Sequence, residues 1–292
     1  MLLRSAVGVQ IVRFEPRGPW KMVSANGECR MKTVLTAVIA MASIAAVAEL
    51  PPHLIEAITN AAAVTEAKTY TNAAGASLNY RFHAPAKVEP VKRYPLVLFL
   101  HGVGSRGSDN TRQLGNGVWP IFSYMKAKGM EGYGYIIAPQ CPDGEKWGPL
   151  VANRMASKPS AAMALVMELL EKTIKDFPVD ARRVYVTGLS MGGFGTWDIV
   201  QRRPDLFAAA MPICGGGDTT LAWKVRSVPI WVFHGDSDTI VPPTYSRQMV
   251  SALWQCDGNV RYREYPGVGH NCWEATYADP TVLDWLFSQM KK

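Results

Sequence analysis

From about residue 68, the hydrophobic pattern of this chain predicts strands that alternate with helices. Short runs of Val, Ile, Leu and aromatic residues are typical of strands buried on both faces, whereas apolar residues spaced three and four apart are typical of amphipathic helices. The alternation of apolar and polar residues at 78–83 predicts a half-buried edge strand. The other predicted strands are 96–100, 135–138, 184–187, 208–213, 230–233 and 260–265, and the predicted helices are 161–174, one that ends at 201, 244–255 and 282–290.

Alternating strands and helices favour parallel strand pairing with right-handed crossovers. We therefore predict an α/β protein with a mostly parallel central sheet and helices on both faces. Only residues 215–228 separate two of the predicted strands, which leaves no room for a large cap domain and predicts an open cleft. In such sheets the ligand site lies beyond the carboxyl ends of the strands, so candidate chemistry is expected directly after each strand.

A G-x-S-x-G motif at 188–192 follows the predicted strand at 184–187 and precedes a helix. This layout predicts a tight strand-to-helix turn that exposes the hydroxyl of Ser190 above the sheet. Side chains at Gly188 and Gly192 would collide as the strand folds back onto the helix, and glycine tolerates the backbone angles involved. Ser190 is therefore the candidate nucleophile.

The two strands after this motif also end in candidate catalytic groups: Asp236 and Asp238 follow one, and His270 follows the other. A serine hydroxyl needs an imidazole to take its proton, and the imidazole needs a carboxylate to orient it. The order serine, acid, histidine is that of α/β-hydrolases. We favour Asp238 as the acid, because its segment continues into the next helix, and expect Asp236 to be a turn residue. His101 and His234 precede a glycine at a strand end, which suits the bracing of loops and leaves His270 as the base.

Hydrolysis through an acyl-enzyme also needs donors for an oxyanion. The N–H of Met191 is one candidate, and the glycine-rich loop at 101–107 offers a second in the N–H of Val103. The alternative is that this loop is only flexible. No Lys follows its glycines as a phosphate-binding loop requires.

Several large side chains lie near the same predicted edge. Trp119, Trp147 and Trp273 fall in predicted loops and, with Arg106, are candidates to line a substrate cleft. A structural role for these aromatic residues is the alternative. Trp197 lies on the helix after Ser190, where we expect it to pack in the core.

The residues before the strand–helix pattern predict a leader. Residues 31–48 have a charged start, an apolar run and an Ala-Val-Ala end, which is typical of a secretory signal peptide cleaved before Glu49. A buried helix or a membrane anchor is the alternative, but the run is short for a membrane span. We therefore expect residues 1–30 to be a non-native upstream extension, 49–67 a lead-in segment and 68–292 the catalytic domain. The mature protein would be secreted or periplasmic, with no stable membrane insertion.

Composition fits this picture, since 48% of the residues are hydrophobic and 19% are charged. The formal net charge is +7, but residues 1–48 hold six basic and two acidic residues, so the mature chain keeps about +3. Both signs are interspersed, which argues against a nucleic-acid partner.

Four cysteines lie in the predicted mature chain. Cys141, Cys214 and Cys272 each follow a strand-like run, whereas Cys256 follows a helix-like run and is expected to stay unpaired. Two of the strand-end cysteines could pair in an exported protein, and buried free thiols are the alternative.

Longer stretches around these motifs resemble a known family. They are residues 98–110, 138–142, 180–197 and 269–273. The resemblance is to bacterial exported esterases related to polyhydroxybutyrate depolymerases and feruloyl esterases, in the clan of dienelactone hydrolases and prolyl oligopeptidases, and it covers about residues 68–290. It implies the α/β-hydrolase fold and the catalytic triad Ser190, Asp238 and His270. Family members often carry Glu where this chain has Ser105, which leaves the partner of Arg106 open.

The sequence thus predicts a secreted serine carboxylesterase that forms an acyl-enzyme. The open cleft suits esters with a small or aromatic acyl group, including those of polysaccharides. No cofactor or metal is expected. The alternatives are a serine peptidase of the prolyl oligopeptidase-like clan and a non-catalytic binding module on a hydrolase scaffold.

Overall fold

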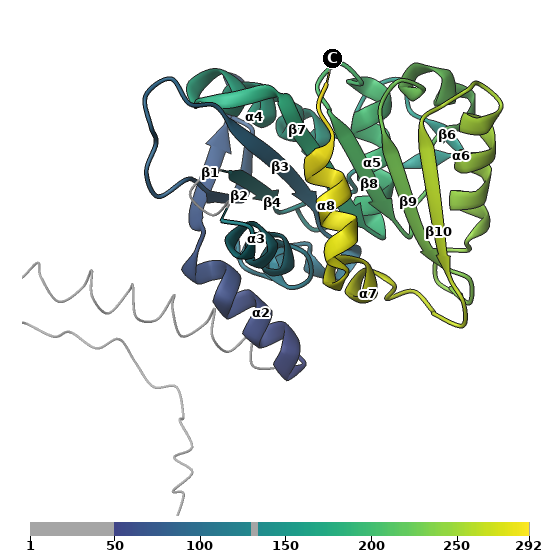
Figure 1. Cartoon of the computed structure of the whole chain (residues 1–292), viewed down its shortest axis with the longest axis horizontal. Coiled ribbons are helices and arrows are strands. Elements are labelled where there is room, and N and C mark those ends of the chain that lie inside the picture. Colours follow the sequence, from purple (N-terminus) through teal and green to yellow (C-terminus); the bar gives the residue numbers. More distant parts are fainter. Residues whose placement is uncertain (1–49, 130–133, 292) are drawn as a thin grey trace, which may run out of the picture. The chain divides into compact units, whose positions relative to one another are not determined.

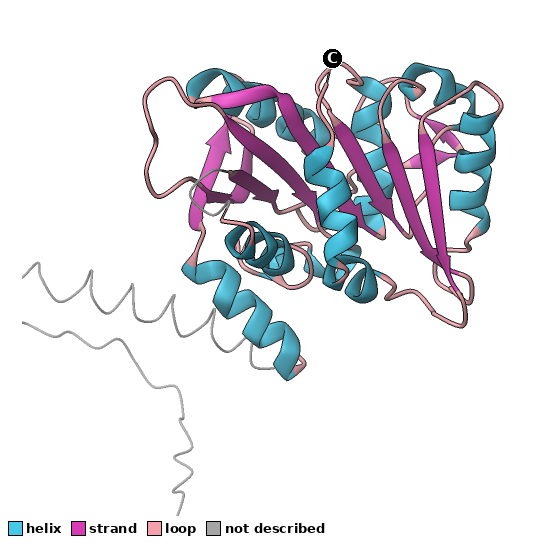
Figure 2. Ribbon diagram, in the orientation of Figure 1, coloured by secondary structure: helices cyan, strands magenta, loops and turns pink. Residues whose placement is uncertain are grey.

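The computed structural model describes residues 50–129 and 134–291, which build an eight-stranded sheet with helices on both faces (Figures 1 and 2). The expected upstream extension and signal peptide lie outside the described residues. Among the helices that are described, none combines the length and the hydropathy needed to cross a membrane.

The sheet contains β1 (Glu66–Thr71), β2 (Ser77–His83), β3 (Tyr94–Leu100), β4 (Tyr135–Pro139), β7 (Val179–Leu189), β8 (Ala209–Ile213), β9 (Ile230–Gly235) and β10 (Val260–Tyr265). A separate small hairpin pairs β5 (Leu150–Val151) with β6 (Arg154–Met155). The α-helices are α2 (Pro52–Ala63), α3 (Val118–Ala127), α4 (Ala161–Asp176), α5 (Met191–Arg202), α6 (Thr244–Trp254), α7 (Trp273–Ala278) and α8 (Pro280–Ser288). Three 3-10 helices are η1 (Val103–Ser105), η2 (Arg112–Leu114) and η3 (Thr219–Val225).

The strand order is β1-β2-β4-β3-β7-β8-β9-β10. The β1–β2 and β2–β4 pairs are antiparallel, and the strands from β4 to β10 run parallel to one another. The carboxyl ends of β3, β7, β8, β9 and β10 therefore meet at one edge of the sheet. The predicted mostly parallel sheet is confirmed.

Side chains of the central strands alternate between two cores. In β3, Leu96, Leu98 and Leu100 pack in one core, and Val97 and Phe99 pack in the other. The first core also takes buried residues of α4, α5 and α6, whereas the second takes those of α2, α3, α7 and α8. Figure 1 shows α3 and α8 in front of the sheet. This double cover explains why the central strands read as uninterrupted apolar runs.

The structure adds elements that the hydrophobic pattern did not predict: α2, β1, α3 and α7. Strand β1 has the sequence EAKTYT and lies at the sheet edge, so it lacks an apolar run. Helix α3 carries Pro120 within its first turn, where proline is tolerated because that N–H has no helical partner. Helix α8 starts at Pro280 and ends at Ser288, rather than spanning 282–290.

The connection between β8 and β9 holds only η3 and short loops. Within the described residues no domain is inserted there, as the sequence predicted.

Candidate active site

Ser190 occupies the turn between β7 and α5. Its backbone has φ 54° and ψ −119°, a conformation that non-glycine residues adopt only when their surroundings enforce it. The N–H of Ser190 donates to the carbonyl of Ile213 at 2.9 Å, and its own carbonyl accepts from Phe194 at 3.0 Å. The turn is thus tied both to β8 and to the first turn of α5.

The backbone around this turn is too crowded for side chains at two of its glycines. A Cβ at Gly188 would lie 2.5 Å from the carbonyl oxygen of Gly192 and 2.6 Å from that of Leu100. A Cβ at Gly192 would collide with the carbonyl oxygen of Leu100. Glycine at both positions lets α5 approach the ends of β7 and β3, as the sequence predicted.

The three predicted triad residues meet at the carboxyl edge of the sheet. The Ser190 hydroxyl and His270 Nε2 are 2.9 Å apart, and His270 Nδ1 and Asp238 Oδ2 are 2.6 Å apart. These distances fit a chain in which Ser190 Oγ–H donates to Nε2, and Nδ1–H donates to the carboxylate. Side chains that are 80 and 32 residues apart in the sequence are therefore in hydrogen-bond contact.

The Asp238 carboxylate is buried but well supplied with donors. Its Oδ1 accepts from the N–H groups of Ile240 and Val241, both at 2.9 Å. Burial alone would raise the pKa of Asp238, but the hydrogen bonds from His270 and from these two N–H groups outweigh it. The pKa therefore lies below its ordinary value, and the carboxylate stays ionised at neutral pH.

His234 braces the loop that carries Asp238. Its Nε2 lies 2.9 Å from the carbonyl of Val241 and 3.2 Å from Asp238 Oδ2, and its Nδ1 lies 2.7 Å from the Ser246 hydroxyl. Burial lowers the pKa of His234, so the ring is neutral at pH 7. The expected bracing role is confirmed.

Asp236, the other candidate for the acid, bonds to residues other than His270. Its Oδ1 accepts from the N–H of Gly267 at 2.8 Å and from the Ser237 hydroxyl at 2.7 Å. The bond from Gly267 joins the loop after β10 to the loop after β9, and the Asp236 side chain is exposed. Asp236 is thus a loop residue, in line with the prediction.

The two candidate oxyanion donors share one feature. Met191 is the first residue of α5, and Val103 is the first residue of η1. The N–H groups at the start of a helix have no acceptor within that helix and are free to bind a ligand. A Cβ at Gly102 would lie 3.7 Å from the Cβ of Ser190, so the loop of Val103 lies directly against the turn.

The buried ring of His101 holds the peptide group that contains the N–H of Val103. The ring Nε2 accepts from the N–H of Cys141 at 2.9 Å, which leaves the proton on Nδ1 to donate to the carbonyl of Gly102 at 2.6 Å. The carbonyl of Gly102 and the N–H of Val103 belong to one planar peptide and point in opposite directions. The imidazole therefore fixes the direction of this N–H.

The tryptophans predicted to line a substrate cleft occupy different environments in the structure. Trp147 is a core residue and not part of a cleft: it is fully buried, and its Nε1–H donates to the carbonyl of His101 at 3.1 Å. Trp119 lies on α3 rather than in a loop, and it lines a hollow of about 460 Å³ beside α7 and α8. Trp273 begins α7, and its ring stands edge-on to His270 with centroids 5.2 Å apart. Trp197 is fully buried, as predicted.

Within the described part of the chain, Arg106 pairs with no acidic side chain. Its Nη1 donates to the backbone carbonyl of Glu145 at 3.3 Å, while its Nε is buried without a partner. The loop that carries Arg106 is also tied to the end of β4, since Gln140 donates to the carbonyl of Ser105 at 3.2 Å. Arg106 thus lies near the candidate oxyanion loop as a structural link, and no contact directs it at Ser190.

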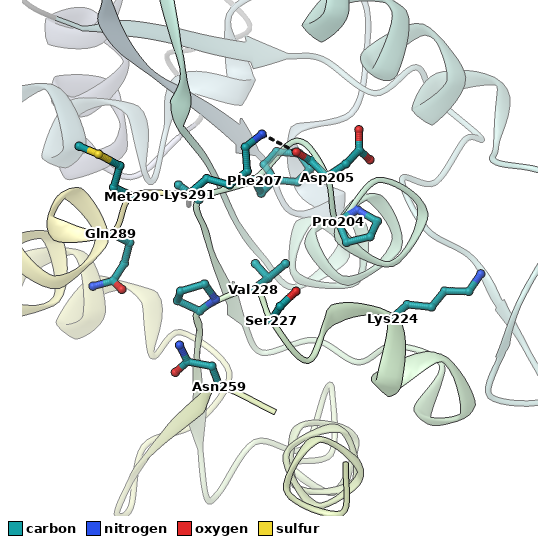
Figure 3. Close-up of a pocket in the computed structure, with 12 residues that line it drawn as sticks. Pro204, Asp205, Phe207, Lys224, Ser227, Val228, Asn259, Gln289, Met290 and Lys291 are labelled. Carbon is teal, nitrogen blue, oxygen red and sulfur yellow. Dashed lines mark hydrogen bonds between the residues drawn. The ribbon is translucent and has the colours of Figure 1, made fainter. Parts of the chain in front are cut away.

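Two other features of the described residues carry no assigned chemistry. Cys214, His234 and Asp238 offer donor atoms within 4.8 Å of one another, but these atoms already bond to neighbouring groups, so we assign no metal to them. A hollow of about 720 Å³ lies at the amino ends of β8 and β9 (Figure 3). It is lined by Pro204, Phe207, Lys224, Pro229 and Lys291 among others, and by none of the candidate catalytic residues.

Comparisons with known proteins agree with this fold. The chain belongs to the family described as Phospholipase/Carboxylesterase, which matches residues 86–279. It is similar to the crystal structure of a thermostable esterase, with a TM-score of 0.72 and 37% identity over 78% of this chain and 64% of that one. The predicted α/β-hydrolase fold is confirmed.

Two curated relatives match parts of the chain. One is the bifunctional acetylxylan esterase/xylanase XynS20E of Neocallimastix patriciarum, 27% identical over 173 residues, or 59% of this chain and 23% of the relative. The other is poly(3-hydroxyalkanoate) depolymerase C of Paucimonas lemoignei, 41% identical over 51 residues, or 18% and 12%. The chain spans less than a quarter of either relative. The resemblance to polyhydroxybutyrate depolymerase-like esterases is confirmed.

His101 makes the stability of the fold depend on pH. Burial lowers its pKa from 6.5 to about 4, so the unfolded chain binds this proton more readily than the folded one. The contribution to stability is therefore complete above about pH 6.5 and falls by about 3 kcal/mol as the pH drops to about 4. We expect His101→Asn to flatten the pH dependence of the free energy of urea unfolding over this range, even if the variant is less stable at pH 7.

The matched control is His53→Asn, which changes an exposed imidazole. We expect this variant to keep the pH dependence of the wild type. If His101→Asn and His53→Asn gave equal slopes between pH 4 and 6.5, the buried ring of His101 would not be the source of the effect.

Proposed function

We propose that this protein is a serine carboxylesterase whose nucleophile, base and acid are Ser190, His270 and Asp238. The observation that carries the proposal is the continuous hydrogen-bonded chain from the Ser190 hydroxyl through the imidazole to an ionised, buried carboxylate. Such a chain removes the proton from the hydroxyl and stabilises the imidazolium that forms. Family membership supports the same reaction class.

In the proposed reaction Ser190 Oγ attacks the ester carbonyl carbon while His270 Nε2 takes the hydroxyl proton. The carbonyl oxygen becomes an oxyanion and binds the N–H groups of Met191 and Val103, which are already oriented before substrate arrives. His270 then protonates the leaving alcohol as the carbon–oxygen bond breaks and the acyl-enzyme forms. A water molecule, deprotonated by the same imidazole, releases the acid and restores Ser190.

For the alcohol part of the substrate, a polar groove beside α6 favours a polysaccharide. It has a volume of about 460 Å³, and Tyr245, Gln248 and Gln255 line one side of it. Their spacing places them along one face of the helix, over about 15 Å. Amide side chains and an aromatic ring are suited to hydroxyl-rich ligands, because they offer donors, acceptors and a flat apolar surface.

The groove begins near the site. Tyr245 is the second residue of α6, and its ring lies 5.5 Å from that of Phe194, one helical turn after Ser190. The opposite wall includes Arg154 of the β5–β6 hairpin. Asp218 holds this wall, since it pairs with Arg154 at 3.3 Å and accepts from the N–H of Met155 at 3.0 Å. Burial would raise the pKa of Asp218, but its hydrogen bonds lower it more, so the anchor stays charged.

The role of Ser190 is tested by Ser190→Ala. We expect p-nitrophenyl acetate hydrolysis to fall by at least about 10⁴-fold, because the acyl-enzyme can no longer form. Labelling by a fluorophosphonate probe should also disappear, while circular dichroism and the unfolding midpoint stay close to those of the wild type.

Controls separate this proposal from its alternatives. Ser237→Ala removes an exposed hydroxyl near the site and should leave both rate and labelling unchanged. Faster cleavage of short peptide amides than of p-nitrophenyl acetate or methyl ferulate would favour a peptidase. A folded wild-type protein that neither turns over these substrates nor takes the probe would be a binding module.

The groove is tested by the double variant Gln248→Ala/Gln255→Ala. We expect kcat/KM on acetylated xylan to fall about 5- to 30-fold, from the loss of one or two hydrogen bonds, with no change on p-nitrophenyl acetate. Trp254→Ala is the control, because Trp254 is exposed on the same helix but does not line the groove. Equal effects on both substrates, or none on the polymer, would rule the groove out as a substrate site.

We also propose that the protein is exported, on the evidence of the leader-like residues 31–48. When the full chain is expressed in a bacterial host, the protein recovered outside the cytoplasm should begin at Glu49, as N-terminal sequencing would reveal. Intact protein that starts at Met1 or Met31 and stays in the cytoplasm would contradict export.

A further inference from the structure

Two buried cysteines lie in contact beside the candidate catalytic histidine. The sulfur atoms of Cys214 and Cys272 are 3.0 Å apart, and both residues are fully buried. Cys214 directly follows β8, and Cys272 lies two residues after His270. The Sγ of Cys214 also lies 3.1 Å from the carbonyl oxygen of His270. The pair thus spans the space between the sheet edge and the loop that carries the imidazole.

The two cysteines belong to different parts of the structure. The N–H of Cys214 donates to the carbonyl of Phe233 in β9 at 2.9 Å, which fixes it to the sheet. On the other side, His270 follows an irregular loop that contains Gly267 and Gly269, and Gly267 has a positive φ of 69°. Cys272 is the residue through which this loop passes into α7. A bond between the sulfurs would therefore tie the loop that carries His270 to the end of β8.

We propose that Cys214 and Cys272 form an intramolecular disulfide that fastens the His270 loop to the end of β8. Geometry favours this pair over the other cysteines, because the sulfurs need to approach by only about 1 Å to reach the bond length of a disulfide. Cys256 lies in the turn after α6 and contacts the carbonyl of Leu253, and the N–H of Cys141 bonds to His101. No contact brings either of these two near the pair in the described residues.

The oxidant is a disulfide from outside the chain. It belongs either to a small molecule such as oxidised glutathione or to an oxidoreductase. The thiolate of one cysteine attacks a sulfur of this oxidant and expels one thiolate, which leaves a mixed disulfide on the chain. The thiolate of the other cysteine then attacks the sulfur of the first cysteine in this mixed disulfide, which forms the bond between the two cysteines and expels the second thiolate of the oxidant. Two protein thiols lose two electrons and two protons, and one external disulfide is reduced to two thiols.

This exchange takes place before the chain has folded completely. In the folded protein both sulfurs are out of reach of a protein oxidant, and the hydrogen bond with Cys272 together with burial raises the pKa of the Cys214 thiol far above its ordinary value. The thiolate needed for attack is therefore scarce once the core has closed. The same burial protects the finished bond from reductants, so it lasts as a structural link rather than a switch that opens in each cycle.

The bond is detected by counting thiols in the purified full chain after refolding with oxidised glutathione. Under denaturing conditions, alkylation without prior reduction should label two fewer cysteines than alkylation after reduction. Peptide mass mapping should then show a linked pair that contains Cys214 and Cys272. When the bond is reduced in denaturant and the protein is refolded with the reductant present, the unfolding midpoint should be lower by roughly 8–15 °C, because the bond closes a loop of about 60 residues.

Variants separate the bond from simple packing of two thiols. Cys214→Ala/Cys272→Ala should have a midpoint near that of the reduced wild type and should not respond to reductant. Cys256→Ala is the control and should respond as the wild type does. The proposal is overturned if all cysteines of the refolded wild type are alkylated without reduction, or if the linked peptides contain another pair. This readout is independent of activity, so it stands or falls separately from the proposed esterase.

Discussion

The close approach of α5 to the ends of β7 and β3 is the constraint on which the rest of the site depends. With no side chain at Gly188 or Gly192, the helix can begin with only Ser190 between it and the strand. This forces Ser190 into a positive φ, which costs about 1–3 kcal/mol and is held by bonds to Ile213 and Phe194. The same turn leaves the N–H of Met191 without a helical acceptor, so one constraint places both the proposed nucleophile and a proposed oxyanion donor.

Environment then separates three imidazoles into different roles. Burial keeps the rings of His101 and His234 neutral, and all of their nitrogens bond to the backbone or to a buried hydroxyl. Each therefore fixes a loop. The ring of His270 is partly exposed, faces Ser190, and rests on the ionised Asp238. Of these three rings, only that of His270 has a nitrogen in contact with the Ser190 hydroxyl, which is why we propose His270 as the base.

Much of this site followed from the sequence, because the carboxyl ends of parallel strands meet at one edge and each triad residue lies just past such an end. The sequence did not predict the segments whose positions are set by tertiary contacts. Trp147 lies in an irregular segment that packs against His101. Because this segment is neither helix nor strand, no periodic pattern in the sequence predicts that Trp147 is buried. Strand β1 is polar because it is an edge strand, and α3 has a proline near its start, so neither carried the expected signal.

The architecture separates the residues of the proposed triad from the walls of the proposed substrate groove. Ser190 lies one residue beyond β7, Asp238 three beyond β9 and His270 five beyond β10, so short connections tie every member of the triad to the sheet. The groove walls, by contrast, come from one face of α6 and from a hairpin outside the sheet, held by Asp218. Substitutions in these groove walls would not alter the strand ends that carry the three residues. Such a scaffold can take different alcohols without moving the hydroxyl, the imidazole or the carboxylate.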